Sequence, residues 1–166
     1  MAIPHFTAEG FFLAWYLLGR ELPDSPDPKL VYPYAVNGAF CIELYLKALS
    51  LCTKGGYLTD HKLDELFKAL SLEEQQQCNT YFLEEIRTEP CASQWRELES
   101  AMKARGTTLP SDLQRIFREI GDSFVKMRYP FELGFSSLYG CRQIRDALQR
   151  RLFELHPALK PKELKP

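Results

Sequence analysis

The segment between Pro33 and Cys52 constrains the fold most, because the helix that it predicts is apolar on nearly every side. At 100° per residue, one side carries Ala35, Ala39, Ile42, Leu46 and Leu49, and the other carries Cys41, Leu44, Ala48 and Leu51. Pro33 suits the first turn of this helix, and Gly55 and Gly56 are expected to follow its end. A helix without a broad polar face must be surrounded by other elements. We therefore expect residues 33–52 to form the central helix of the protein.

The rest of the chain shows helical periodicity and no sustained strand alternation. Further helices are expected at about 7–20, 61–69, 71–87, 94–104 and 111–128, with a last one from Ser136 or Ser137 through Leu155. Thr7, Asp60 and Ser71 stand where N-caps are expected. The sequence thus predicts an all-α, up-and-down helical bundle of five to seven helices. We expect a single domain over residues 1–156, followed by a Pro- and Lys-rich tail at 157–166.

The composition is that of a globular domain. Apolar residues make up 45% of the chain and the formal net charge is −1, which distinguishes it from disordered chains and from general nucleic-acid binders. The apolar patch at residues 11–18 is too short to cross a bilayer and lacks a basic leader. The five cysteines are scattered and form no C-x-x-C pair, so we expect reduced thiols. These features predict a cytoplasmic protein with no membrane span.

Charge is unevenly distributed along the chain. Residues 57–100 hold ten acids and four bases, whereas residues 101–166 hold thirteen bases and seven acids. Four of these bases lie on the flank of the predicted last helix: Arg142, Arg145, Arg150 and Arg151. Such a split can steer an anionic ligand to the basic half, or it can let two copies of the chain pair head to tail. The sequence leaves both possibilities open.

The sequence signatures of several common enzyme classes are missing. The chain has no P-loop, no G-x-G-x-x-G, no H-E-x-x-H and no G-x-S-x-G. His5, His61 and His156 are far apart and lack the spacing of metal ligands, so no metal site is predicted. No cofactor is expected, and the motifs leave open whether the chain is an enzyme.

Three polar residues interrupt the apolar surface of the central helix. Asn37 projects between Leu44 and Ala48, and a buried amide needs a hydrogen-bond partner, because leaving it unpaired costs roughly 1–3 kcal/mol. Glu43 and Lys47 stand about one turn apart and can form an ion pair. These residues either link neighbouring helices or line a cleft for a ligand.

Two later positions add to this polar set. His61 follows Asp60 at an expected helix start, where the helix dipole favours a neutral ring that suits a base or a hydrogen-bond link. Arg128 and Tyr129 end another predicted helix. Arg128 can there bind the last carbonyl groups, pair with Glu43, or hold a phosphate through two hydrogen bonds. Capping and packing roles compete with ligand binding at both positions.

Taken together, these residues resemble the HEPN superfamily of small helical domains. The resemblance rests on the stretch from Asn37 to Lys47, on the segment from His61 to Phe67, and on Arg128 with Tyr129. It implies a helical bundle, frequent homodimerisation, and work on RNA or nucleotides. It also implies toxin–antitoxin, phage-defence or nucleotidyltransferase-linked systems, with a cognate nucleotidyltransferase or an antitoxin as partner.

Many members of that superfamily are metal-independent endoribonucleases. Their signature is an arginine, an adjacent polar residue, and a histidine after four to six intervening residues. No histidine follows Arg128 at positions 133–135, and only Arg150 and His156 have the required spacing, with Arg151 in place of the polar residue. In such an enzyme the histidine acts as general base or acid, and the arginine stabilises the charge of the phosphorane.

The leading hypothesis is a HEPN-like helical module that binds a nucleotide, RNA or a partner protein without the usual ribonuclease pair. Six residues would line its cleft or form a buried polar network: Asn37, Glu43, Lys47, His61, Arg128 and Tyr129. A metal-independent endoribonuclease that uses Arg150 and His156 is the first alternative. The second is a non-catalytic interaction or antitoxin-like module that acts through its acidic half.

Overall fold

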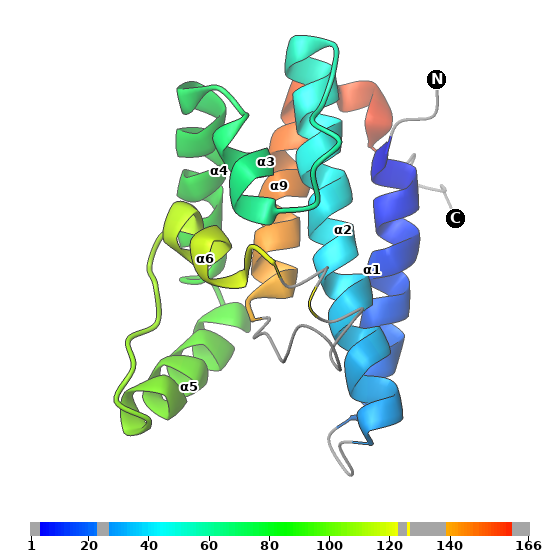
Figure 1. Cartoon of the computed structure of the whole chain (residues 1–166). Coiled ribbons are helices and arrows are strands. Elements are labelled where there is room, and N and C mark those ends of the chain that lie inside the picture. Colours follow the sequence, from blue (N-terminus) through cyan, green and yellow to red (C-terminus); the bar gives the residue numbers. More distant parts are fainter. Residues whose placement is uncertain (1–3, 23–26, 123–125, 127–138, 161–166) are drawn as a thin grey trace, which may run out of the picture.

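The protein is described by a computed structural model, which covers residues 4–22, 27–122, 126 and 139–160. These residues contain α-helices and one short 3-10 turn, η1, and no strand (Figure 1). The helices are α1 (Pro4–Glu21), α2 (Pro28–Lys54), α3 (Leu63–Lys68), α4 (Leu72–Glu85), α5 (Cys91–Ala104), α6 (Leu113–Ile120) and α9 (Cys141–Leu155), and η1 spans Pro157–Leu159. The prediction of an all-α bundle is therefore confirmed.

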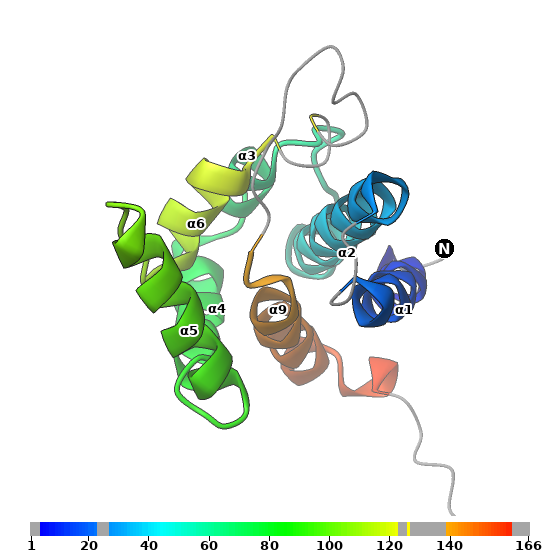
Figure 2. The same ribbon diagram turned by 90° about the horizontal axis from the view of Figure 1, so that it is seen from below.

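Helix α2 lies at the centre of the bundle. It packs along α1, which runs antiparallel to it, and it also contacts α9 and α3 (Figure 1). Viewed from below, α9 lies between α2 and α4, while α3 and α6 pack against each other (Figure 2). Ile42, Tyr45, Leu46 and Leu49 of α2 are completely buried. The prediction of a central helix is confirmed, and its nearly uniform apolar surface is explained by neighbours on several sides.

The central helix begins earlier than predicted. Asp27 is its N-cap and accepts a hydrogen bond from the Lys29 backbone N–H at 2.9 Å, and Pro28 takes the first turn. Pro33 lies inside the helix and not at its start, which corrects the expected boundary. The end was predicted correctly, because Gly55 adopts a left-handed conformation (φ 73°) and its N–H binds the Leu51 carbonyl.

Other helix starts also differ from the predicted ones. Helix α1 begins at Pro4 and not at Thr7, and α5 begins at Cys91, three residues before the expected start. The last helix starts at Cys141, because Gly140 before it has a φ of 65° and interrupts the helical backbone. The end predicted near Arg128 lies outside the described residues.

The predicted cap at Ser71 is confirmed in part. Its hydroxyl oxygen accepts a hydrogen bond from the Glu74 backbone N–H at 3.2 Å, as expected for the spacing of a capping box. The Glu74 carboxylate, however, binds Arg151 of α9 through two hydrogen bonds of 2.7 and 2.8 Å. The Glu74 side chain, which a capping box would place on the N-terminus of α4, thus links α4 to α9 instead.

The cysteines lie mostly in the core, and all five are free thiols. Burial raises the pKa of Cys41 and of Cys78 to about 12, so both thiols stay protonated at neutral pH. Within the described residues, one helical segment, Lys29–Lys54, is long and apolar enough to cross a bilayer, but most of it is buried inside the bundle. It therefore has the arrangement of a core helix.

Candidate functional site

Three of the predicted site residues meet in one cluster. Lys47 Nζ donates a hydrogen bond to Glu43 Oε1 at 2.8 Å, and His61 Nδ1 lies 3.0 Å from the same oxygen. The Glu43 side chain is 1% exposed and that of Lys47 is 9% exposed, whereas His61 is half exposed. We call these three residues the Glu43 cluster. It joins α2 to the loop that precedes α3.

Hydrogen bonds between the Asp60 side chain and backbone N–H groups stabilise the loop that carries His61. Asp60 Oδ1 accepts hydrogen bonds from the backbone N–H groups of His61 at 2.6 Å and Lys62 at 2.9 Å. The bond from Lys62 contributes most to lowering the pKa of Asp60. Asp60 thus stabilises a turn before α3, which begins at Leu63 and not at His61 as expected.

The position of Glu43 suits a structural role better than ligand binding. Its second oxygen, Oε2, is buried and has no hydrogen-bond partner among the described residues. The Lys47 ammonium compensates the carboxylate charge and also lies 5.8 Å from the centre of the Tyr57 ring. A charged group that is this deeply buried is stable only while its counter-ion is present.

The other predicted polar residues do not join this cluster in the described structure. Asn37 is half-buried, and its Nδ2 donates to the Pro33 carbonyl of its own helix at 2.7 Å. The Nδ2 group of Asn37 is thus satisfied within its own helix, α2. Arg128 and Tyr129 lie outside the described residues.

The arrangement does not favour a catalytic pair of Arg150 and His156. Arg150 Nη1 binds Glu84 Oε2 at 2.6 Å, and its guanidinium lies 3.9 Å from the centre of the Tyr81 ring. His156 is exposed at the C-cap of α9. Arg150 is thus engaged with two residues of α4, and no contact between Arg150 and His156 is present in the described structure.

The arginines of α9 neutralise acids from the first half of the chain. Arg145 Nη2 binds Glu9 Oε2 of α1 at 2.8 Å, and Arg151 binds Glu74 of α4. Together with Arg150, three of the four arginines expected on this flank hold acids on other helices. Two of these pairs, Arg150–Glu84 and Arg151–Glu74, join the basic half to the acidic part at residues 57–100, so part of the uneven charge is compensated within one chain.

A buried polar network that the sequence did not predict connects α1, α2 and α9. The Tyr45 hydroxyl donates to Glu9, and Gln149 Nε2 donates to the Tyr45 hydroxyl at 3.0 Å and to Glu9 at 3.1 Å. Arg145 completes the network and stacks on Phe12, 3.8 Å from its ring centre. Burial, and then the bond to Glu9, raise the pKa of Tyr45. The available sequence signal was Glu9, an acid just before the apolar run of the first helix.

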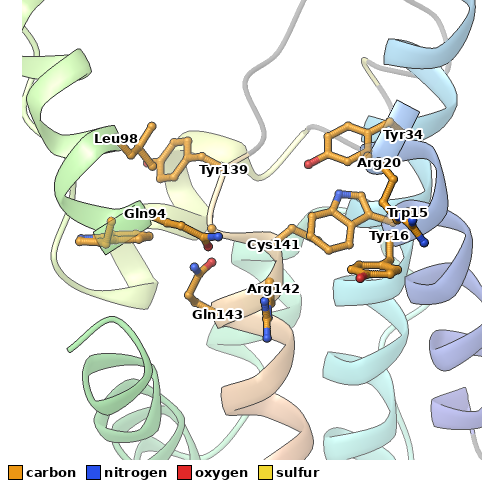
Figure 3. A pocket seen from close by; sticks show the side chains of 13 residues that line it. Trp15, Tyr16, Arg20, Tyr34, Gln94, Leu98, Tyr139, Cys141, Arg142 and Gln143 are labelled. Atoms are coloured by element: carbon orange, nitrogen blue, oxygen red, sulfur yellow. The ribbon is translucent and has the colours of Figure 1, made fainter. Parts of the chain in front are cut away.

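A cavity lies elsewhere, between α1 and α2 on one side and α5 and the start of α9 on the other (Figure 3). Its volume is about 370 Å³. Five aromatic residues line it: Trp15, Tyr16, Tyr34, Trp95 and Tyr139. Arg20, Arg142, Gln94 and Gln143 are its main polar lining residues. We call this site the aromatic cavity, and no residue of the Glu43 cluster lines it.

One wall of the aromatic cavity is a stacked pair. The rings of Trp15 and Tyr34 have centres 5.4 Å apart and an interplanar angle of 27°. A Cβ atom on Gly19 would lie 2.9 Å from the Tyr34 ring, so only glycine leaves room for this packing. The Trp15 indole nitrogen is buried without a hydrogen-bond partner among the described residues. Burial raises the pKa of the Tyr34 hydroxyl, which keeps it protonated.

Trp95 and Tyr139 belong to the opposite side of the cavity. Trp95 packs edge-on against Phe82, with ring centres 5.3 Å apart. A Cβ atom on Gly140 would lie 3.1 Å from the Trp95 ring, so glycine serves both the left-handed backbone and this close approach. Figure 3 shows Tyr139 facing Tyr34 and Trp15 across the cavity. The cavity therefore has aromatic side chains on both of its sides.

The electrostatic character of the cavity favours an anion. Its described lining contains Arg20 and Arg142 and no acidic side chain. Within the part of the chain that the structure describes, the one ion pair of Arg142 is a loose contact, with its Nε 3.7 Å from Asp146 Oδ2. Helix α9 begins at the cavity, and its N-cap Gly140 offers no side chain to cap the first backbone N–H groups. Such N–H groups, together with the helix dipole, attract negative charge.

The aromatic cavity was missed at the level of sequence. Trp15 lies in the apolar patch at residues 11–18, and Trp95 lies in a helix with a polar pattern. Of its five aromatic residues, Trp95 stands next to an Arg and Tyr139 next to a Gly, and the other three have no such neighbour that could mark a site. No protein-family model, no curated protein and no solved structure matches this chain significantly.

Proposed function

We propose that this protein is a HEPN-like helical module that binds a nucleotide, free or within single-stranded RNA, in the aromatic cavity. The observation that carries the proposal is the combination of aromatic rings on both sides with two arginines and no acid in the described lining. The cavity volume of about 370 Å³ falls in the range of small-molecule sites. The proposal draws further support from the sequence resemblance to the HEPN superfamily.

Each part of a nucleotide finds a suitable group in this cavity. A base stacks on aromatic side chains such as Trp15 and Tyr139, in the manner used by proteins that bind single-stranded RNA. A phosphate binds Arg142 and the first N–H groups of α9. The described lining contains no histidine, so this site offers binding without an evident general base.

Intrinsic fluorescence tests this proposal directly, because the only two tryptophans of the chain, Trp15 and Trp95, both line the cavity. Titration with nucleoside monophosphates, corrected for nucleotide absorbance, is expected to quench this fluorescence with a saturating curve. Arg142→Ala is expected to weaken binding about tenfold, since it removes one charge-assisted contact to the phosphate.

The matched control is Arg150→Ala, which removes an arginine from the same helix outside the cavity. It is expected to leave the binding curve unchanged. The proposal fails if no nucleoside monophosphate quenches the fluorescence, or if Arg142→Ala and Arg150→Ala weaken binding equally. Metal-independent cleavage of a generic RNA by the purified protein would favour the endoribonuclease alternative.

A further inference from the structure

Gln143 is a buried polar residue that lines the aromatic cavity. It lies in the first turn of α9 and is only 6% exposed. Its side-chain amide has no hydrogen bond within the part of the chain that the structure describes. Buried side-chain amides are rarely left unpaired in folded proteins, because burial removes them from water. The Gln143 amide is therefore available to a ligand in the cavity.

A second glutamine lines the same cavity from another helix. Gln94 lies on α5, directly before Trp95, and is more exposed than Gln143. Its side-chain amide also has no hydrogen bond to any described residue. Figure 3 shows the side chains of Gln94 and Gln143 converging on one part of the cavity, the first from α5 and the second from α9. We call these two residues the amide pair.

The chemistry of two convergent amides matches the edge of one base, adenine. The NH2 group of a glutamine donates hydrogen bonds and its oxygen accepts them, so one amide pairs with a donor that stands next to an acceptor. Glutamine binds the N7 atom and the 6-amino group of adenine in this way. The 6-amino group has two hydrogens and stands between two ring acceptors, N7 and N1. Each amide of the pair can thus accept from the amino group and donate to one ring nitrogen.

The other bases match the amide pair less well. Guanine has an oxygen at position 6, so one amide can pair with this oxygen and the N1–H group, but the second amide would face two acceptors, the same oxygen and N7. Cytosine and uracil have a C–H group on one side of the corresponding position, so they offer a matching edge to one amide only. The described lining also contains no carboxylate to accept from the N1–H and 2-amino groups of guanine.

We propose that the amide pair makes the aromatic cavity selective for adenine, so that its ligand is an adenine nucleotide, either free or as an adenosine within single-stranded RNA. This inference rests on the proposed nucleotide site and adds Gln143 to it as a specificity-determining residue. The base stacks on an aromatic ring of the cavity while its edge meets the two amides. Contacts of Arg142 with the phosphate are the same for every base, so they contribute affinity without selectivity.

Tryptophan fluorescence titrations with adenosine monophosphate (AMP) and guanosine monophosphate (GMP) test this selectivity. The wild type is expected to bind AMP about tenfold more tightly than GMP, because a bidentate amide contact discriminates between bases by about this factor. Purine riboside monophosphate, which lacks the 6-amino group, is expected to bind about as weakly as GMP. Gln143→Leu removes the buried amide and is expected to weaken AMP binding about tenfold, so that the preference for AMP over GMP is lost.

The control Gln114→Leu changes a glutamine of α6 that does not line the cavity, and it is expected to leave both affinities unchanged. Because the Gln143 amide has no described partner, Gln143→Leu is expected not to lower the melting temperature. A lower melting temperature with unchanged selectivity would reduce Gln143 to a packing role. Equal wild-type affinities for AMP and GMP, or a preference for GMP, would overturn adenine selectivity and leave the nucleotide site standing. No quenching by any nucleotide would overturn the proposed function itself.

Discussion

Replacing Arg151 by alanine is expected to lower the free energy of unfolding by about 3 kcal/mol, the cost of leaving a buried charge without its partner. Arg151 Nε and Nη2 bind the two Glu74 oxygens at 2.7 and 2.8 Å, and both side chains are largely buried between α4 and α9. Its pKa is raised chiefly by this bond, so the guanidinium is fully charged. The melting temperature should fall by roughly 6–12 °C, which thermal unfolding followed by circular dichroism will measure.

The neighbouring residue supplies a matched control. Arg150 pairs with Glu84, but both side chains are about half exposed, so Arg150→Ala should cost less than about 1 kcal/mol. Adding Glu74→Gln to Arg151→Ala should restore part of the lost stability, because a neutral amide is cheaper to bury than a carboxylate. Equal losses for Arg151→Ala and Arg150→Ala would show that burial does not distinguish the two pairs.

Replacing Glu43 by alanine is expected to have an effect of similar size, again about 3 kcal/mol. The change removes the carboxylate that holds the Lys47 ammonium at 2.8 Å and contacts His61 at 3.0 Å. Lys47 is then left nearly buried with no described acid in contact. Urea denaturation will measure the change, and the midpoint should fall without a large change in slope.

Asn37→Ala is the control for this prediction, since it changes a polar residue of the same helix. The Asn37 amide binds only the Pro33 carbonyl of α2 in the described structure, and alanine has the higher helix propensity. Its effect should lie within about 0.5 kcal/mol of zero. Combining Glu43→Leu with Lys47→Met should recover stability relative to Glu43→Ala, because it removes both charges. A larger loss from Asn37→Ala than from Glu43→Ala would contradict the structural role of the Glu43 cluster.

The fold was largely predictable because apolar periodicity is a local property of the sequence. A helix that is apolar almost all round could only be central, and α2 is central. Helix boundaries were less predictable where two nearby segments both carried residues typical of a helix start. Asp27 followed by Pro28 forms the helix start, whereas Pro33 also suits a first turn and stands closer to the apolar run. The left-handed backbone of Gly140 determines where α9 begins, and the hydrophobic periodicity of the sequence does not indicate backbone conformation.

The candidate site was predicted only in part, because contacts between distant segments are not encoded by spacing along one helix. Glu43 and Lys47 are one turn apart, so their ion pair was visible in the sequence. The aromatic cavity, in contrast, combines α1, α2, α5 and α9, and its residues become neighbours only when these helices pack. The same reason explains why the Glu9–Arg145 pair, between the first and the last helix, was missed.

Amide hydrogen exchange with and without a nucleoside monophosphate is the most direct test of where a ligand binds. We expect slower exchange at residues 15–20, 94–98 and 139–143, which line the aromatic cavity, when nucleotide is present. Residues 43–47 and 57–63, around the Glu43 cluster, should exchange at unchanged rates. Slower exchange confined to 57–63, or no change in any segment, would contradict a nucleotide site in the aromatic cavity.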